Sequence, residues 1–257
     1  MISKEAMAVL AECTVQDKVI RINSGQLDRK TYEAVNVVLD ALGGKWDRKN
    51  KGHICSYDPS DALASVVSTG QVPDKNPLAY FPSTQVVVDS MIDRLILYGT
   101  NKVCTILEPS AGDGAIVAAL RQRIPRSIGI VAVEIDPGRA QQIRDRKLPD
   151  VEVIEADFLQ WQPARGGFEA ILMNPPFRTP NLPLAYLDHI ERALSMRAKE
   201  GILLAVTPIG WQYSGNRARL VQFREMVERE GYTLELPEKA FSSSGTDVRS
   251  CVVEFVD

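Results

Sequence analysis

Four consecutive residues, Asn174-Pro175-Pro176-Phe177, carry the groups best suited to chemistry in this chain. They follow the apolar run 168–173, which we expect to form a buried strand. Neither proline can donate a backbone hydrogen bond, so the strand must stop and the backbone must turn outward. The Asn174 side-chain carbonyl, the Pro175 main-chain carbonyl and the Phe177 ring would then converge.

Two hydrogen-bond acceptors beside an aromatic face suit a planar ring that carries an exocyclic amine. The acceptors would hold the two amine hydrogens, draw the nitrogen lone pair out of conjugation and stabilise the positive charge that develops as the nitrogen is alkylated. Stacking of the ring on Phe177 would contribute about 1–3 kcal/mol per base. The alternative is an ordinary turn with Phe177 in the core, and the rest of the chain must decide between the two.

A second candidate lies upstream, where the expected strand 103–107 runs into the loop 108–114, EPSAGDG. Gly112 and Gly114 let the backbone turn sharply and approach a ligand closely. A dinucleotide-binding fingerprint would have a third glycine where Val117 stands. The two acidic residues of the loop would also repel a pyrophosphate. A cationic cofactor without phosphates fits the loop better.

Acidic residues also follow the next two expected strands. Glu134 comes after residues 128–133, where a carboxylate can accept hydrogen bonds from both hydroxyls of a ribose. Asp157, after residues 151–154, could accept from an adenine amine, and Phe158 could cover the adenine ring. Any one of these acids could be a helix cap or a surface charge. At the carboxyl ends of successive strands, together with Asn174, they describe one crevice.

The elements that must position these residues alternate along the second part of the chain. Alternation of strand and helix predicts a doubly wound, mostly parallel, seven-stranded Rossmann-like sheet. The last two strands have no helix between them, so we expect them to be antiparallel neighbours. The expected strands are 103–107, 128–133, 151–154, 170–173, 201–207, 232–236 and 250–255, and the expected helices are 114–123, 138–147, 184–196 and 219–230, with one more after 80–84.

The first part of the chain predicts a separate, small α+β unit over residues 1–75, followed by a larger domain over 78–257. We expect a strand at 15–22, a helix that Asp28 caps and Gly43-Gly44 ends, two short strands within 45–57, and a helix from 58 to near 70. Residues 70–77 have the composition of a linker.

Positive charge gathers around the turn of that expected strand pair. Lys45, Arg48, Lys49 and Lys51 lie within seven residues, beside Trp46. This pattern predicts a basic hairpin that contacts a phosphate backbone. The alternative is a solvated turn with Trp46 packed on a helix.

Two later loops, 213–219 and 241–247, are further candidates for nucleic-acid contact, unless they are ordinary surface loops. Their candidate residues are Arg217, Arg219 and Ser244.

Composition excludes several other classes of function. The 257 residues are 45% hydrophobic and 25% charged, with no apolar run long enough to span a bilayer and no signal-peptide core. The four cysteines are scattered without CxxC spacing and only two histidines are present, so we expect no metal and a reducing, cytoplasmic location. A net charge of −3 argues against a binder that is basic all over, although not against a local basic patch.

Three segments together resemble an S-adenosylmethionine-dependent methyltransferase. Residues 107–114 resemble the first cofactor motif of that family, and Asn174-Pro175-Pro176-Phe177 resembles the catalytic motif of its amino-modifying members. Residues 81–84, FPST, resemble the segment that touches the methionine part of the cofactor. Because this segment precedes the glycine loop, the order is similar to that of the gamma-group DNA adenine-N6 methyltransferases.

The resemblance covers roughly residues 78–257 and implies S-adenosylmethionine as cofactor and DNA as partner. It implies catalytic roles for Asn174, Pro175, Pro176 and Phe177, and cofactor contacts for Phe81, Ser83, Glu108, Pro109, Ala111, Gly112, Gly114, Glu134, Ile135, Asp157, Phe158 and Asn174.

The chain departs from this family in two ways. Ser83-Thr84 stands where Thr-Pro is usual, and 257 residues leave no room for a large target-recognition domain. Each specified base needs its own side-chain contacts, so we expect low sequence specificity, or recognition through residues 1–75. That first unit resembles segments fused to methyltransferases of phages and other mobile elements.

The function that the resemblance implies is direct methyl transfer to the N6 amine of a flipped adenine in DNA. Cytosine N4, an RNA base and a protein glutamine amide remain open, because each presents a planar NH2 group. A non-catalytic nucleic-acid-binding protein with the same fold is the alternative of another class. Oligomeric state is left open.

Overall fold

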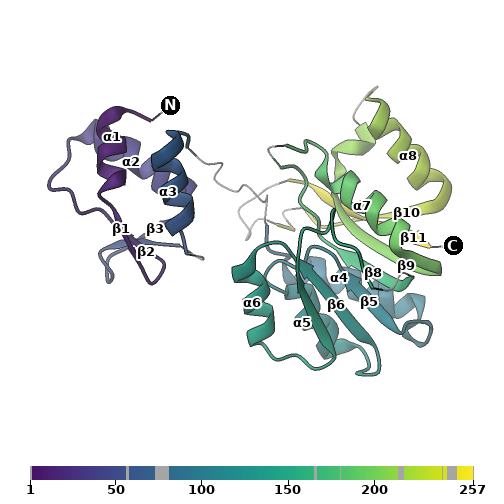
Figure 1. Cartoon of the computed structure of the whole chain (residues 1–257). Coiled ribbons are helices and arrows are strands. Elements are labelled where there is room, and N and C mark those ends of the chain that lie inside the picture. The colour runs from purple at the N-terminus through teal and green to yellow at the C-terminus, as the bar shows by residue number, and fades with distance from the viewer. Residues whose placement is uncertain are drawn as a thin grey trace. The chain divides into compact units, whose positions relative to one another are not determined.

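The computed structural model describes residues 2–55, 58–72, 81–164, 167–179, 181–213, 217–238, 240–241 and 248–256. Its contacts divide the chain into two compact units, Met1–Leu78 and Ala79–Asp257, here called the N-terminal and C-terminal units (Figure 1).

The N-terminal unit packs three helices against a four-stranded antiparallel sheet with the strand order β1-β2-β4-β3. Its buried core is built from aliphatic residues such as Leu10, Ile20 and Leu39. The elements are α1 (Lys4–Ala11), β1 (Thr14–Gln16), β2 (Val19–Arg21), α2 (Arg29–Ala41), β3 (Lys45–Asp47), β4 (Gly52–Ile54) and α3 (Ser60–Thr69).

Two features of this unit differ from the sequence-based expectation. The single strand expected at 15–22 is wrong, because Asp17 and Lys18 take φ values of 51° and 66° and turn the chain between β1 and β2. Helix α1 was not expected; the Ser3 hydroxyl caps it by accepting from the Ala6 amide. The expected cap of α2 is confirmed, since the Asp28 carboxylate accepts from the Thr31 amide.

The C-terminal unit contains a seven-stranded sheet in the order β10-β11-β9-β8-β5-β6-β7. The strands from β5 to β9 pair in parallel, and β11 pairs antiparallel with both β9 and β10, as the sequence predicted. Its elements are α4 (Gln85–Tyr98), η1 (Thr100–Lys102), β5 (Thr105–Glu108), α5 (Ala115–Arg123), β6 (Gly129–Glu134), α6 (Pro137–Asp145), β7 (Val151–Glu155), β8 (Phe168–Met173), α7 (Ala185–Met196), β9 (Arg197–Pro208), η2 (Ile209–Tyr213), α8 (Ala218–Glu230), β10 (Gly231–Glu235) and β11 (Ser250–Val256).

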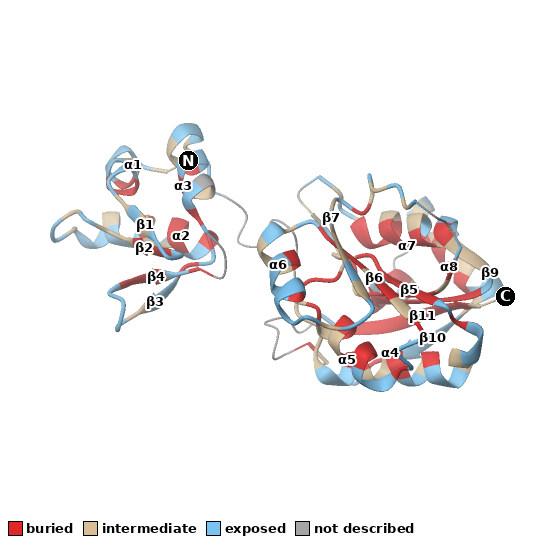
Figure 2. Cartoon of the chain, turned by 60° about the horizontal axis from the view of Figure 1, so that its bottom comes forward, coloured by how far each residue is buried: buried red, intermediate tan, exposed pale blue. Residues whose placement is uncertain are grey.

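Helices cover both faces of this sheet, so its central strands are buried on both sides (Figure 2). Ile106 packs with residues of α4, α5 and α6, whereas its neighbour Leu107 packs with residues of α7 and α8. Continuous apolar strands are what a doubly covered parallel sheet requires. Within the described ranges, every helix is too short or too polar to span a membrane.

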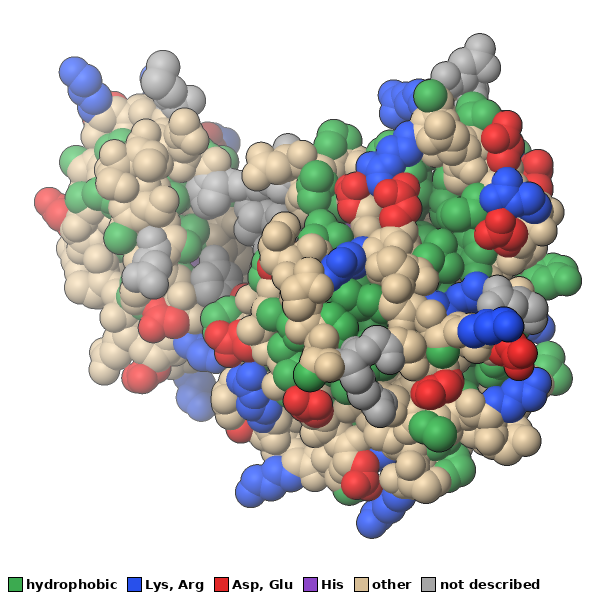
Figure 3. Space-filling model, turned by 45° about the vertical axis from the view of Figure 1, so that its right-hand side comes forward, with side chains coloured by type: hydrophobic (Ala, Val, Ile, Leu, Met, Phe, Trp, Pro, Cys, Tyr) green, Lys and Arg blue, Asp and Glu red, His purple; other side chains and the backbone are tan. Residues whose placement is uncertain are grey.

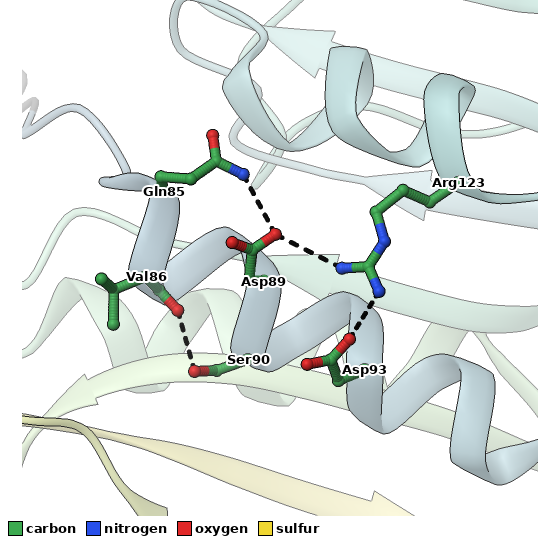
Figure 4. Close-up of polar contacts among 6 residues, drawn as sticks. All are labelled: Gln85, Val86, Asp89, Ser90, Asp93 and Arg123. Atoms are coloured by element: carbon green, nitrogen blue, oxygen red, sulfur yellow. Dashed lines mark hydrogen bonds and ion pairs between the residues drawn. The ribbon is translucent and has the colours of Figure 1, made fainter.

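Helix α4 is tied to its neighbours by charged side chains. Arg123 of α5 reaches Asp89 at 3.3 Å and Asp93 at 2.6 Å, both on α4 (Figure 4). Arg94 on the same helix pairs with Glu254 of β11, and its Nε lies 2.7 Å from the carboxylate. These contacts join the middle of α4 to α5 and β11.

Candidate active site

The carboxyl ends of four parallel strands lie side by side at one end of the C-terminal sheet. Because β8, β5, β6 and β7 are consecutive neighbours, Glu108, Glu134 and Asn174 come at adjacent strand ends, and Asp157 follows the last strand. Ligands of open α/β sheets bind outside these carboxyl ends. The predicted crevice residues therefore share this edge of the sheet.

The glycine loop between β5 and α5 is bonded to the neighbouring strand. The Ala111 amide donates to the Val133 carbonyl at 2.9 Å, and the Gly112 amide donates to Glu134 Oε2 at 2.7 Å. Gly112 and Gly114 have φ values of 56° and 79°, in the left-handed region that residues with a side chain rarely adopt. The loop thus needs both glycines to hold its shape.

Glu134 is buried, and its second carboxylate oxygen is also engaged. Oε1 accepts from the Asp136 amide at 2.8 Å and from Arg139 Nη2 at 2.8 Å. Glu134 therefore links the glycine loop to the first turn of α6. Arg139 Nε also donates to Oε1, at 3.1 Å, so three donors reach Oε1, whereas Oε2 accepts from Gly112 alone among the described residues. Each carboxylate oxygen offers two acceptor positions, so one position on Oε2 is left for a ribose hydroxyl, and that contact stays a prediction.

Glu108 at the end of β5 is completely enclosed. Burial, together with the nearby Asp113 and Glu134 carboxylates, raises its pKa well above the ordinary value. The Val117 amide hydrogen-bonds its carboxyl group, but among the described residues Glu108 Oε2 and Ser110 Oγ are buried without a partner. Such atoms carry a free-energy penalty that a polar or cationic ligand would relieve. The loop therefore suits a cofactor with cationic and hydroxyl groups.

The Asn174 amide is oriented by the segment that precedes α4. Its Nδ2 donates to the Ser83 hydroxyl at 3.0 Å and to the Phe81 carbonyl at 3.3 Å. A carbonyl can only accept, so the NH2 end must face Phe81 and the Oδ1 end faces away. No described residue donates to Asn174 Oδ1 or to the Pro175 carbonyl. Two acceptors are thereby left for a ligand.

The Phe177 ring, which we expect to lie beside these acceptors, is partly exposed. Phe177 packs against both core clusters, and Tyr186 of α7 supports it in an edge-on contact with ring centroids 6.4 Å apart. Pro175 is buried, whereas Pro176 is half-buried.

The remaining predicted cofactor residues vary in exposure. Ile135 is exposed, Pro109 and Ala111 are buried, and Asp157 is exposed with one oxygen accepting from the Leu159 amide at 2.9 Å. Phe158 is 3% exposed and packs against the His189 ring. Burial lowers the pKa of His189 and so favours its neutral form. The proposed contacts of these residues with adenine stay predictions.

The predicted nucleic-acid residues lie on different elements. Lys45, Arg48, Lys49 and Lys51 are exposed at the β3–β4 hairpin. Arg217 is exposed before α8, and Ser244 lies outside the described residues. Arg219 already pairs with Asp188 at 2.8 Å and Glu191 at 2.9 Å on α7, which would compete with a phosphate.

The surface of the C-terminal unit gives no strong charge signal on the face that Figure 3 shows, where acidic and basic side chains are interspersed. Among the described residues, no group of three or more His, Cys, Asp or Glu side chains could hold a metal ion.

Three supporting residues were not foreseen from the sequence. Arg139 holds Glu134, Tyr186 supports Phe177, and the Thr84 hydroxyl donates to the Ala240 carbonyl at 2.6 Å. Arg139 could have been found, since Asp136-Pro137 is a helix-start signal that places residue 139 in the first turn, near the end of β6. The other two contacts join residues that are distant in sequence.

Methyltransferases are among the known proteins that are similar to this chain. The tRNA1(Val) (adenine(37)-N6)-methyltransferase of Klebsiella pneumoniae is 36% identical over 124 residues, which are 40% of this chain and 51% of that protein. Type II methyltransferase M.TthHB8I of Thermus thermophilus is 36% identical over 154 residues, 50% of this chain and 34% of that protein. The chain thus spans about half or less of the curated relatives it matches, and no protein-family model matches it.

Solved structures show the same fold. A Listeria monocytogenes protein assigned to the class I S-adenosylmethionine-dependent methyltransferases superposes with a TM-score of 0.56 at 12% identity, covering 99% of this chain and 87% of its own. TrmN from Thermus thermophilus superposes with a TM-score of 0.50 at 17% identity, covering 68% and 50%. The C-terminal unit therefore has the Rossmann-like fold that is also found in S-adenosylmethionine-dependent methyltransferases.

Proposed function

We propose that this protein methylates the exocyclic N6 amine of adenine in DNA, with low sequence specificity. The observation that carries the proposal is a pair of acceptors, Asn174 Oδ1 and the Pro175 carbonyl, to which no described residue donates and which belong to the same segment as the Phe177 ring. Because the NH2 end of Asn174 is held by Ser83 and Phe81, an acceptor and not a donor faces the ligand. A planar amine is the complement of this arrangement.

In the proposed reaction the chain's own residues hold the target base. Asn174 and Pro175 accept the two amine hydrogens, orient the nitrogen lone pair and stabilise the positive charge that develops on it. Phe177 stacks the ring of an adenine flipped from its helix, at a cost of a few kcal/mol. When bound, S-adenosylmethionine supplies an electrophilic methyl group that passes to the amine directly, without a covalent enzyme intermediate.

The cofactor would lie against the glycine loop. Gly112 and Gly114 bring the backbone close, while Glu108 and Ser110 offer buried polar atoms that have no partner among the described residues. Glu134 and Asp157 are the proposed acceptors for ribose and adenine. The predicted cytoplasmic location and phage origin stay predictions.

RNA is the second candidate substrate. The Klebsiella pneumoniae relative is named for adenine N6 methylation of a tRNA, and its identity to this chain is the same as that of the Type II methyltransferase. Two open acceptors would hold an adenine amine equally well in either nucleic acid. We place DNA first because segment 81–84 precedes the glycine loop.

The test is transfer of labelled methyl from S-adenosylmethionine to unmethylated duplex DNA, single-stranded DNA, bulk RNA and a glutamine-containing peptide, followed by identification of the modified nucleoside or residue. We expect N6-methyladenine in DNA at many sequence contexts. Label in RNA alone would replace DNA by the second candidate. No label in any nucleic acid, despite measurable cofactor binding, would overturn the proposal.

Asn174→Ala tests the residue at the centre of this proposal. We expect turnover to fall by roughly a hundredfold or more, because a preorganised group that stabilises developing charge contributes on that scale. Cofactor affinity, measured by calorimetry, should change little. Asn101→Ala, an exposed asparagine ahead of β5, is the matched control, and near-normal turnover of Asn174→Ala would show that the amine acceptor is misassigned.

A further inference from the structure

Four cations gather at one end of the N-terminal sheet. Arg48, Lys49 and Lys51 belong to the β3–β4 turn, and the strand register brings Arg21 of β2 to the same end. Ile20 pairs with His53, so Arg21 comes opposite Gly52. A Cβ placed on Gly52 would lie only 3.2 Å from Arg21 Cγ. Lys45 pairs with Ile54 and therefore lies at the other end of β3. We call Arg21, Arg48, Lys49 and Lys51 the cationic end of the sheet.

These positive charges are not neutralised within the part of the chain that the structure describes, where none of the four forms an ion pair. The acid in the hairpin, Asp47, is used by the turn, since its Oδ1 accepts from the Asn50 amide at 2.6 Å and from Asn50 Nδ2 at 3.0 Å. Glu12 lies nearby, and its carboxylate accepts from Ser24 at 2.8 Å.

The backbone of the β3–β4 hairpin is held by specific contacts. Lys51 takes a φ of 48°, and a side chain at Gly52 would come within 2.6 Å of Val19 Cγ1 and 2.8 Å of the Ile20 carbonyl. Close packing of β4 on β2, together with the Asp47–Asn50 bonds, orders the backbone from which the cations extend. A backbone that is already ordered loses little conformational freedom when its side chains bind a polyanion.

An exposed aromatic residue lies on the strand that leads into this turn. Trp46 of β3 is 60% exposed, and it touches His53 edge-on with ring centroids 5.2 Å apart. A tryptophan packed on a helix, which the sequence left open, would not expose so much of its ring. Trp46 is two residues before Arg48 in the sequence, so its indole offers a stacking surface for a base while the cations of the turn offer contacts for phosphates.

We infer that the cationic end of the sheet binds a single nucleic-acid strand, with its Lys and Arg side chains on phosphates and Trp46 stacked on a base. This inference rests on the proposed function only in that a nucleic acid is the substrate. It assigns to the N-terminal unit the task of holding the strand, while the chemistry belongs to the C-terminal unit.

The test measures binding of the full-length protein to fluorescein-labelled oligothymidylate by anisotropy at several salt concentrations. Thymidylate contains no exocyclic amine, so the measurement does not depend on methylation. The variants are Trp46→Ala, Trp46→Phe and the double variant Arg48→Gln/Lys49→Gln. The matched control is Lys4→Gln/Lys30→Gln, which removes the same charge from exposed positions of α1 and α2. Circular dichroism checks that each variant is folded.

We expect Trp46→Ala to weaken binding about tenfold, and Trp46→Phe to keep most of the affinity. The double variant should lower the slope of log K against log salt by about 1.4, because each phosphate contact on a single strand contributes roughly 0.7. Binding should also quench the emission of wild-type protein but not that of Trp46→Phe.

Wild-type affinity in both the Trp46→Ala and the double variant would overturn the inference, as would equal loss in the control, which would indicate only overall charge. These outcomes are separable from the proposed function. Methylation without oligothymidylate binding would remove the inference alone, and binding without methylation of any nucleic acid would remove the function alone.

Discussion

The polar groups at the two sheet edges have different surroundings. In the C-terminal unit, Glu134 is buried and bonded to Gly112 and Arg139, and Asn174 is bonded to Ser83 and Phe81. At the cationic end of the N-terminal sheet, Arg48, Lys49 and Lys51 are exposed and Arg21 is half-buried, and none of them forms an ion pair with a described residue. Chemistry on one amine needs atoms fixed to a fraction of an ångström, whereas attraction to a polyanion needs only charge at roughly the right place.

The largest expected difference between the two edges is in stability. Arg139→Ala should lower the free energy of unfolding of the C-terminal unit by about 3 kcal/mol, because it leaves the buried Glu134 carboxylate without its cation. Arg48→Ala at the hairpin should change stability by less than about 0.5 kcal/mol.

Urea unfolding measures both variants, with tryptophan fluorescence for Arg139→Ala in the C-terminal unit and circular dichroism for Arg48→Ala in the N-terminal unit. In a Trp46→Phe background the signal comes from Trp161 and Trp211, which both lie in the C-terminal unit, and circular dichroism follows the whole chain. If both variants lost the same free energy of unfolding, the hydrogen bonds and ion pair around Glu134 would contribute no more to stability than the exposed cations of the hairpin.

A smaller effect is expected in the rate. Ser83→Ala removes one of two acceptors that hold the Asn174 amide, so turnover should fall roughly five- to tenfold, in line with about 1 kcal/mol for one hydrogen bond. Ser83→Thr keeps a hydroxyl and should restore most of the rate. Cofactor affinity should stay within about twofold, the scale of an interaction worth less than 0.5 kcal/mol.

The opposite pattern would also be informative. If Ser83→Ala weakened S-adenosylmethionine binding and left turnover intact, Ser83 would be a cofactor contact, as the resemblance of segment 81–84 implies, and the Asn174 amide would be held by the Phe81 carbonyl alone.

The fold of the C-terminal unit was predictable because its signals are local. Prolines after β8, glycines after β5 and apolar runs with helices between them each act over a few residues, and the parallel sheet follows from their alternation. The single strand expected at 15–22 was wrong because the turn at Asp17-Lys18 contains neither glycine nor proline and so gives no turn signal.

The site was predictable as a set of residues at strand ends, but its bonding was not. That Arg139 pairs with Glu134, or that Ser83 accepts from Asn174, depends on side chains meeting across elements whose packing the sequence does not state. Likewise, Arg21 joins the hairpin cations only through the register of β2 and β4. The positions of residues in the sequence predict which of them lie at neighbouring strand ends, but only the structure shows which hydrogen bonds and ion pairs each side chain makes.

The smallest expected effect is a difference between wild type and Glu108→Gln in how the free energy of unfolding depends on pH. Glu108 keeps its proton in the folded protein above the ordinary carboxyl pKa of 4.5, because burial and the Asp113 and Glu134 charges oppose ionisation. The unfolded chain loses that proton first, so the folded state binds more protons in this range and stability falls as pH rises above about 4.5. Glu108→Gln cannot titrate and should lack this loss.

Unfolding of wild type and Glu108→Gln from pH 5 to 8 measures the difference, again through Trp161 and Trp211 in the Trp46→Phe background. The variant should gain stability over wild type as pH rises, and it should bind S-adenosylmethionine more weakly if Glu108 is the cofactor contact that we propose. The exposed Arg48→Gln/Lys49→Gln variant should follow the wild-type pH profile. Parallel profiles for Glu108→Gln and wild type would mean that Glu108 is ionised in the folded protein over this range, so that burial does not raise its pKa.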